Sequence, residues 1–509
     1  MEPQEIQRVR GTNDATPPES AELDRIQRAM RGYFELYGYR PIDTPIIEDL
    51  DLFLRKSGEE IVARMYTFTH WNRQLCLRPE LTASVLRAYT NHLQDRPLPV
   101  RLHYAGPAFR YEKPQRGRYR QFTQVGLECI GGEGAAADAE ILAAALGSIA
   151  TLGLTDARIV IGHLGAVLQM LRQLGIDEHG QSLILASLEH LGRRRAERED
   201  VVSRILTLMG LNRADDVDDP EPSLLPSLLA QFGPSGATNV AADLLARANL
   251  TLESGTRTPE EVVERLLAKA GRPDATTQVH RAIDFIVELA DAAGSPPEGI
   301  DRLDALLARH GLDAAPLREV ERAIALLGSY QVGNPEISID LSLGRGLRYY
   351  TGMVFEIHHG PAGPSSQICG GGRYDDLVRA LGGRENVPAC GFSFGLERVR
   401  MALQAAHATD EGARPSDAIV APIESADEAE SIALSQRLRA AGLAVELDVR
   451  LRGVRANLRN ADRANVPVLV ICGQQELRQG QVIVRDMRGR EEKAVSLADV
   501  PRVVKEILA

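Results

Sequence analysis

Arginine, glutamate and tyrosine gather in a few short stretches of this chain, and these residue types bind anions, cations and polar rings. The densest stretch, Phe109 to Phe122, holds five basic residues around a Pro and a Gly. Two strand-like segments joined by such a loop would aim guanidinium groups at one place, and an arginine fork binds two phosphate oxygens at once. The pattern favours a polyphosphate or nucleic-acid ligand, and a solvated hairpin with surface arginines is the simpler alternative.

A second stretch runs from Leu77 to Ser84 and contains Glu80 beside Thr82. A hydroxyl of Thr82 or Ser84 could simply cap a helix expected from Ala83 to Tyr89. A glutamate beside a helix cap could instead bind the ammonium group of a ligand. Both interpretations stay open at this point.

Further along, glycines alternate with arginine, tyrosine and acidic residues. The stretches are Leu343 to Gly352, Cys369 to Asp375 and Gly391 to Arg398. Glycine lets a backbone approach a ligand closely, and tyrosine offers a hydroxyl on an apolar ring. A plain glycine turn is the alternative for the triple glycine. Because the chain has no Gly-Lys-Ser/Thr phosphate loop, the sequence argues against P-loop chemistry.

Composition limits what can position these stretches. The chain has 509 residues, enough for about two to four domains. Its 59 basic and 70 acidic residues give a net charge of −11, which excludes a uniformly basic coat for nucleic acid. Five scattered cysteines offer no disulfide framework or zinc-type cluster. No run approaches the roughly 20 apolar residues of a membrane helix and no signal peptide is visible, so we expect a cytosolic protein.

The element pattern divides the chain. Amphipathic helices dominate residues 169–317, for example the segment that Thr258-Pro259-Glu260-Glu261 opens with a cap and a helix-start proline. Strand-like runs lie on both sides of this block, as if one domain were split by an insertion. A polar stretch, His407 to Asp417, reads as a linker. Beyond it, strands alternate with helices, which indicates an α/β domain.

Taken together and in this order, these stretches resemble class II aminoacyl-tRNA synthetases, and among them the histidyl-tRNA synthetases. The resemblance rests on Arg10 to Asp14, on Thr44 to Glu48 as motif 1, on the Arg110 loop as motif 2, on Gly391 to Arg398 as motif 3, and on histidine-specific stretches at Arg345 and Gly371.

The resemblance implies a mixed α/β (α+β) fold with a six-stranded antiparallel catalytic sheet flanked by helices. The catalytic domain would comprise residues 1–168 and 318–406, split by a helical insertion at 169–317. Residues 415–509 would form an α/β domain similar to the family's anticodon-binding domain. The resemblance also implies a homodimer, with Pro45 near its interface.

It further implies a histidine–tRNA ligase that uses ATP, with Mg²⁺ bound alongside the nucleotide and no metal site of its own. Arg110 would contact the α-phosphate and the histidine carboxylate, Arg118 and Arg398 the outer phosphates, and Glu112 the adenine region. Arg345 would stabilise charge that develops on the α-phosphate. Catalysis of this kind is mostly positioning and charge stabilisation.

Histidine selection is implied for a second set of side chains. Glu80 and Thr82 would lie near the amino group, and Gln124 near the carboxylate. Acceptors and hydroxyls that read both ring nitrogens would reject amino acids lacking them. The residues expected around the imidazole are Glu128, Tyr349, Tyr350 and Tyr374.

Two positions depart from the family pattern. Arg348 stands where the family normally has Asp, and Leu81 stands where it normally has Gly, so that a branched side chain is expected to restrict the loop. These changes keep two alternatives open: a histidine-sensing regulatory paralogue, such as the regulatory subunit of ATP phosphoribosyltransferase, and an RNA-binding module without catalysis.

The C-terminal part carries a basic stripe. Arg452, Arg455, Arg459 and Arg463 recur at helical spacing, which predicts one arginine-rich helix face. A merely solvated face is the alternative. Because the position matches the basic helix of the family's anticodon-binding domain, we expect Arg452, Arg455 and Arg459 to contact tRNA phosphates.

Overall fold

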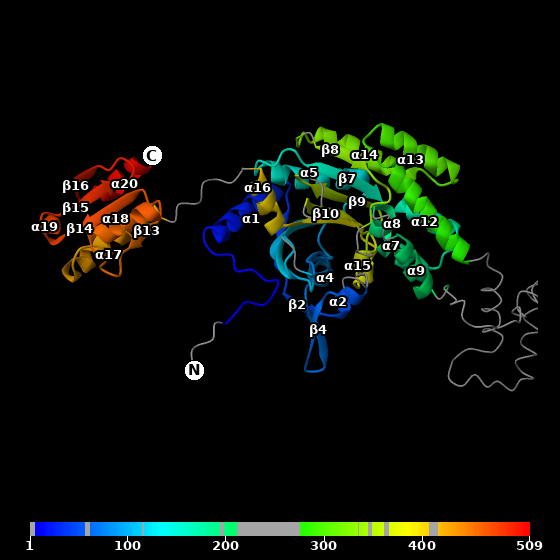
Figure 1. Cartoon of the computed structure of the whole chain (residues 1–509), viewed down its shortest axis with the longest axis horizontal. Coiled ribbons are helices and arrows are strands. Elements are labelled where there is room, and N and C mark those ends of the chain that lie inside the picture. Colours follow the sequence, from blue (N-terminus) through cyan, green and yellow to red (C-terminus); the bar gives the residue numbers. More distant parts are fainter. Residues whose placement is uncertain are drawn as a thin grey trace, which may run out of the picture. The chain divides into compact units, whose positions relative to one another are not determined.

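The computed structural model describes residues 6–55, 62–113, 117–193, 198–209, 211, 275–333, 335–344, 349–360, 366–406 and 416–509. These residues form two compact units, one of residues 6–16 and 23–406 and one of residues 17–22 and 416–509 (Figure 1). The helix expected at Thr258 and residues 407–415 of the expected linker lie outside the described residues. None of the described helices is long and apolar enough to cross a membrane.

A mixed sheet forms the framework of the first unit. Its strand order is β1-β5-β6-β11-β10-β9-β7-β8. The six central strands pair antiparallel, and the short edge strands β1 and β8 pair parallel to their neighbours, so the expected antiparallel sheet is confirmed with two additional edges. The strands are β1 (Arg40–Pro41), β5 (Val100–Phe109), β6 (Gln121–Ile130), β7 (Arg158–His163), β8 (Glu336–Ile339), β9 (Met353–His358), β10 (Gln367–Arg373) and β11 (Ala389–Gly395).

This sheet joins segments from both sides of the helical block. Strand β6 pairs on one side with β5, from Val100 opposite Ile130 to Phe109 opposite Gln121. On its other side it pairs with β11, so that Glu128 lies opposite Gly391. The motif 2 hairpin and the motif 3 strand are therefore neighbours, although more than 250 residues separate them in the sequence.

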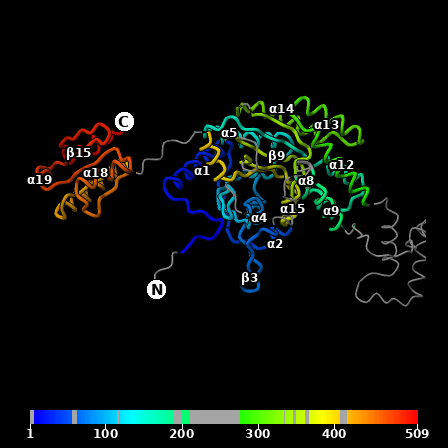
Figure 2. Tube along the Cα trace, viewed as in Figure 1, coloured from blue at the N-terminus to red at the C-terminus, as the bar shows by residue number. Residues whose placement is uncertain are grey.

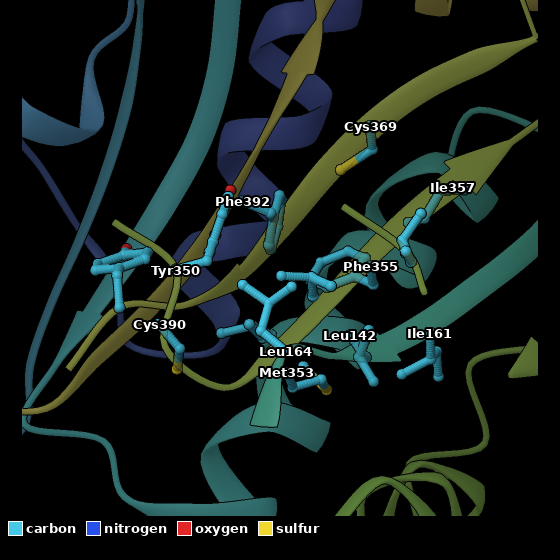
Figure 3. Close-up of a cluster of buried hydrophobic side chains, with 14 of the residues drawn as sticks. Leu142, Ile161, Leu164, Tyr350, Met353, Phe355, Ile357, Cys369, Cys390 and Phe392 are labelled. Atoms are coloured by element: carbon cyan, nitrogen blue, oxygen red, sulfur yellow. The ribbon is translucent and has the colours of Figure 1, made fainter. Parts of the chain in front are cut away.

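Helices cover this sheet and complete its core. Phe34 meets the Phe392 ring at 5.6 Å between ring centroids. Leu142, Ile161 and Phe355 lie in the same buried cluster (Figure 3). Burial of this apolar surface is the main stabilising contribution to the unit. The helices that contribute buried residues to this cluster include α1 (Glu19–Leu36), α4 (Thr82–His92), α5 (Gly134–Ala150), α14 (Ala315–Ser329), α15 (Leu377–Ala380) and α16 (Leu396–Ala405).

The described part of the 169–317 block is helical, as expected, and it belongs to the same compact unit as the sheet. Helix α9 buries Val201, Ile205 and Leu206 on one stripe, and α12 packs against α6, α8, α9 and α13. The helices are α6 (Gly165–Gln173), α7 (Glu178–Ala186), α8 (Leu188–Arg193), α9 (Arg198–Leu208), α12 (Ala275–Ala292) and α13 (Glu298–Arg309).

A small three-stranded sheet, with the order β2-β4-β3, extends beside the main sheet (Figure 2). It consists of β2 (Ile47–Asp49), β3 (Tyr66–His70) and β4 (Arg73–Leu77), and the short helix α2 (Asp51–Leu54) follows β2. Trp71 and Asn72 turn the β3–β4 hairpin with positive φ angles of 48° and 60°. Such angles at both central residues are typical of tight hairpin turns.

The second unit is the expected α/β domain. Strands β13, β12 and β14 are parallel, and β15 and β16 continue the sheet antiparallel. Residues alternate between faces, so Val420 and Val470 lie in one apolar cluster while Ile419 and Leu469 lie in the other with Ala461 of α18. The elements are β12 (Ala418–Pro422), α17 (Glu428–Ala440), β13 (Val445–Leu447), α18 (Val454–Arg463), β14 (Val468–Cys472), α19 (Gln474–Leu477), β15 (Gln481–Asp486), β16 (Glu492–Ser496) and α20 (Val500–Leu508).

Candidate active site

A cleft of about 270 Å³ lies against the main sheet. Its walls come from β6, β9, β10 and β11, from the loop between β5 and β6, and from the first turns of α4 and α16. The structure therefore brings together stretches that the sequence presented separately. The expected residues that line the cleft are Glu80, Thr82, Arg110, Glu112, Arg118, Gln124, Tyr349, Tyr350, Tyr374 and Arg398.

Arg110, Arg118 and Arg398 line the cleft close enough for their charges to interact. Arg398 lies in the first turn of α16 and donates from Nη1 to the Gln367 carbonyl at 2.7 Å and from Nε to the Gly117 carbonyl at 3.2 Å. Burial lowers the pKa of Arg398, and the like charges of Arg118 and Arg110 lower it further. Mutual repulsion of this kind marks a site that an anion would neutralise.

Glu112 partly balances these charges. Its carboxylate is buried and pairs with Arg118, and it lies 3.5 Å from Nη1 of Arg64. Arg64 also lines the cleft, and no motif in the sequence pointed to it. The arginines of the β5–β6 loop are thus not merely a solvated hairpin, because Arg110 and Arg118 face a shared cleft.

Arg110 is held by the stretch around Arg78. Nε of Arg110 donates to the Pro79 carbonyl at 2.8 Å. Arg78 is 1% exposed and donates to the carbonyls of Pro107 at 2.8 Å and Thr44 at 2.7 Å. A buried guanidinium thus ties the motif 1 segment to the motif 2 strand. Arg78 is a positioning residue that sequence reasoning did not single out.

Glu80, not Thr82 or Ser84, serves the start of helix α4. Oε1 of Glu80 accepts from the Ala83 N–H at 2.9 Å. Oε2 is buried without a hydrogen-bond partner among the described residues. Thr82 lies close to the carboxylate and lowers the pKa of Glu80. Burial nevertheless raises the pKa of Glu80, and the charge of Arg110 opposes this. A buried carboxylate oxygen without a partner is a site for a donor such as an ammonium group.

Leu81 does not strain this loop, so the expectation that a branched side chain would restrict it is wrong. The residue has φ −101° and ψ −23°, an ordinary helical conformation that needs no glycine. Its side chain is 2% exposed in the apolar core, and its N–H donates to Oε1 of Gln124 at 3.0 Å. Leucine is therefore accommodated where the family normally has glycine.

Gln124 is oriented by the protein at both ends of its amide. Oε1 accepts from Leu81, and Nε2 donates to the Ser393 hydroxyl at 3.0 Å. The second N–H of Nε2 can still serve a ligand carboxylate, because an amide nitrogen carries two donors.

Three tyrosine rings lie together in the wall of the cleft. Ring centroids lie 4.9 Å apart for Tyr349 and Tyr350 and 5.5 Å apart for Tyr349 and Tyr374. Below them Glu128 is fully buried and accepts from the Tyr374 hydroxyl and, at 2.9 Å, from the Tyr104 hydroxyl. Burial raises the pKa of Glu128 well above its ordinary value. Glu128 thus supports the pocket from beneath rather than lining its open wall.

Gly391 is required by this arrangement. A Cβ atom at this position would collide with Oε2 of Glu128 and would lie 2.6 Å from the Tyr374 hydroxyl. The glycine of motif 3 therefore makes room for the contact between the carboxylate and the tyrosine.

The remaining expectations have different outcomes. Arg345 and Arg348 lie outside the described residues. All five cysteines are buried and free, as expected. The site also contains residues to which the sequence analysis assigned no role, namely Tyr104, Ser393, Glu356 and Glu397. Of these, Tyr104 could have been found from the sequence, because it lies on an apolar strand and a buried tyrosine hydroxyl needs a hydrogen-bond partner.

The C-terminal unit carries the expected arginines in a modified form. Helix α18 begins at Val454 after Gly453, whose φ is 75°. Arg452 therefore precedes the helix, and its expected place on the helix face is wrong. Arg455, Arg459 and Arg463 are exposed on the helix itself.

An antiparallel sheet that presents clustered arginines beside a small pocket of carboxylates and tyrosines is the arrangement expected of a class II aminoacyl-tRNA synthetase. A histidyl-tRNA synthetase family model matches residues 11–219 and 221–399, and an anticodon binding domain model matches residues 417–507. The chain belongs to the histidyl-tRNA synthetase family, whose members are ATP-dependent aminoacyl-tRNA ligases.

Individual relatives agree with this assignment. Histidine–tRNA ligase of Methanocaldococcus jannaschii is 31% identical over 498 residues, which are 97% of this chain and 98% of that protein. The Pyrococcus furiosus histidine–tRNA ligase is 31% identical over 507 residues, with 99% of each chain covered. The apo histidyl-tRNA synthetase of S. aureus superposes with a TM-score of 0.63 at 25% identity, covering 98% of this chain and 100% of that one.

Proposed function

We propose that the protein is an active histidine–tRNA ligase. One observation carries the proposal: a single cleft joins the arginine group of Arg110, Arg118 and Arg398 to the pocket of Glu80 and the tyrosines. In the first step the histidine carboxylate attacks the α-phosphorus of ATP and pyrophosphate leaves. In the second step a hydroxyl of the terminal tRNA ribose attacks the histidyl carbonyl, and AMP leaves.

The arginines would bind ATP. Arg110 would contact the α-phosphate and the histidine carboxylate, while Arg118 and Arg398 would hold the outer phosphates. Arg345 would stabilise charge that develops on the α-phosphate. Fixed donors aimed at developing charge are the largest contribution to such catalysis. Glu112, which holds Arg118 in place, would lie near the adenine.

The pocket would select histidine. The free oxygen of Glu80 would accept from the amino group beside Thr82, and Gln124 would donate to the carboxylate. Tyr349, Tyr350 and Tyr374 would surround the imidazole. Glu128 would act through the Tyr374 hydroxyl, which it holds in place to meet a ring nitrogen, and this discriminates against amino acids without such a group.

Mg²⁺ would accompany the ATP. Glu356 and Glu397 line the cleft and could contribute carboxylate oxygens. Among the described residues, no group of three His, Cys, Asp or Glu could hold a metal by itself. This donor set fits an ion held mainly by phosphate oxygens with one or two carboxylates. The ion would neutralise phosphate charge.

The basic face of the C-terminal unit would contact tRNA. Arg455 and Arg459 are exposed on α18, and Arg452 is exposed beside it. Exposed guanidinium groups displace counterions from a phosphate backbone, so affinity should fall as salt rises.

We also propose a homodimer in the cytoplasm, where the substrates of translation occur. Ile46 and Ile47 follow Pro45 and are 41% and 52% exposed, and Phe68 and Trp71 of the neighbouring β3–β4 hairpin are 39% and 86% exposed. Exposed apolar patches mark protein interfaces. Ile47→Asp should give monomers in sedimentation, whereas Leu36→Asp, an exposed position on α1, should leave the dimer intact. A monomeric native protein would refute the dimer.

A regulatory paralogue is not favoured, because the relatives that match nearly the whole chain at about 31% identity are histidine–tRNA ligases. Histidine-dependent exchange of pyrophosphate into ATP tests the proposal, with Arg348→Asp measured in parallel. Exchange by the native protein is expected. If the native protein shows no exchange and Arg348→Asp gains it, the proposal is overturned and the histidine-sensing regulatory paralogue becomes the better interpretation.

A further inference from the structure

One buried carboxylate organises the basic face of the C-terminal unit. Asp448 follows strand β13, and its side chain is fully buried. The basic face consists of Arg450, Arg452, Arg455, Arg459 and Arg463, all exposed. A buried acid in the middle of a basic surface weakens phosphate binding by its charge, so its place there needs another reason.

The contacts of Asp448 supply that reason. Oδ1 accepts from the Arg450 N–H at 3.1 Å and from Nε of Arg452 at 3.0 Å. Oδ2 accepts from the Arg452 N–H at 2.8 Å and from Nδ2 of Asn457 at 2.7 Å. The carboxylate thus joins the loop backbone, one guanidinium and the first turn of α18.

The loop that Asp448 closes is unusual. Leu451 and Gly453 have positive φ angles of 52° and 75°. A non-glycine residue in this region is uncommon and persists only where surrounding contacts fix it. Asn457 is fully buried and also donates to the Gly453 carbonyl at 3.1 Å, so the same network fixes where α18 begins.

We propose that Asp448 is the positioning residue for tRNA binding: by fixing residues 448–453 it aims Arg452 and sets the start of the arginine-bearing helix α18. The proposal rests on the proposed tRNA contact of this face. The outer part of Arg452 is free to meet a phosphate, because its side chain remains 35% exposed while Nε is bound.

Charge and positioning predict opposite results for Asp448→Asn in the full-length protein. Removal of a negative charge should tighten RNA binding if charge alone matters. Loss of positioning should weaken binding of histidine tRNA about tenfold, because misplaced donors cost affinity. The matched control is Asp462→Asn, an exposed carboxylate on the same helix, which should tighten binding up to about threefold.

A double-mutant cycle tests whether Asp448 acts through Arg452. Arg452→Gln alone should weaken tRNA binding. Adding Asp448→Asn to that variant should lower tRNA affinity much less than Asp448→Asn does alone, because each substitution removes the same contact between Asp448 and Arg452. The KM for tRNA in aminoacylation should rise in both variants while kcat stays within about twofold. Thermal unfolding of each variant reports whether the C-terminal unit remains folded.

The outcomes are distinguishable. If Arg455→Ala combined with Arg459→Ala leaves tRNA affinity unchanged, the proposed tRNA contact fails. If that pair weakens binding but Asp448→Asn tightens it like Asp462→Asn, the positioning role alone is overturned. Additive effects in a folded double variant would also overturn the positioning role. If Asp448→Asn unfolds the C-terminal unit, Arg452→Gln becomes the test, and normal tRNA affinity in that variant would overturn the positioning role.

Discussion

The arginines of the cleft and those of the basic face are held in opposite ways. Arg398 is fixed by two carbonyls and Arg110 by the Pro79 carbonyl, next to the buried positioning residue Arg78. Arg455 and Arg459 project from an exposed helix, and only Arg452 is tied to a carboxylate in the described contacts of that face. The difference fits the ligands proposed for the two regions: a reacting phosphate needs donors at set points, whereas a polyanion can be held by mobile charges.

The largest test of this comparison is Arg398→Lys. Lysine keeps the charge but cannot bind the Gln367 and Gly117 carbonyls as a fork and face phosphates as well. Pyrophosphate exchange should fall about 100-fold. Arg384→Lys is the control, since Arg384 forms an exposed pair with Asp95 that contributes little. An Arg398→Lys enzyme with near-normal exchange would show that the fixed geometry is unnecessary.

Glu128→Gln should have the next largest effect. The change keeps the shape but leaves the Tyr104 and Tyr374 hydroxyls with a weaker acceptor at a fully buried position. The KM for histidine should rise about 30-fold with little change in the KM for ATP. Steady-state exchange kinetics at varied histidine measure this, and Tyr374→Phe should shift the same parameter. If both variants keep the native KM for histidine, the imidazole assignment is wrong.

Sequence reasoning located the strands and most of the cleft because those signals are local. The strand-like runs on both sides of the helical block and the basic stretch after Phe109 each fold as their neighbours dictate, and strands such as β7 and β9 and the β5–β6 hairpin appear there. It failed where the outcome depends on distant pairing. Nothing near Arg64 reveals that Glu112 lies opposite it, and nothing near Leu81 reveals its ordinary helical φ.

The error at Arg452 has the same origin. Helical spacing from Arg452 to Arg463 is regular, but Gly453 adopts a positive φ and the chain enters the helix one residue later. That geometry depends on Asp448, which directly follows strand β13 and accepts hydrogen bonds from the N–H groups of Arg450 and Arg452. Periodicity alone could not separate a loop arginine from a helical one.

The basic face should also show an acid dependence, opposite in sign to that of the buried Glu80 and Glu128, whose pKa values are raised. Hydrogen bonds to Asp448 outweigh its burial and lower its pKa from 3.8 to about 2. Because the folded pKa is depressed, this stabilisation is present above about pH 4 and is lost as pH falls through about 2. As the pH falls from 5 to 3, the free energy of unfolding of the C-terminal unit should fall by about 1 kcal/mol. Amide hydrogen exchange in β12 and β14 measures this stability at each pH, with Asp448→Asn as the reference protein. The same dependence of stability on pH in both proteins would contradict the prediction.

The smallest effects are expected at Arg459, and they sharpen the comparison most directly. Arg459→Ala should weaken tRNA binding about threefold and reduce the slope of log affinity against log salt by about one unit, as expected for one lost phosphate contact. Arg459→Lys should change affinity less than twofold, because an exposed ammonium serves a mobile phosphate nearly as well. Titrations at several salt concentrations measure both. A loss from Arg459→Lys as large as that from Arg459→Ala would mean that this arginine is read by geometry, as in the cleft, and the contrast between the two regions would disappear.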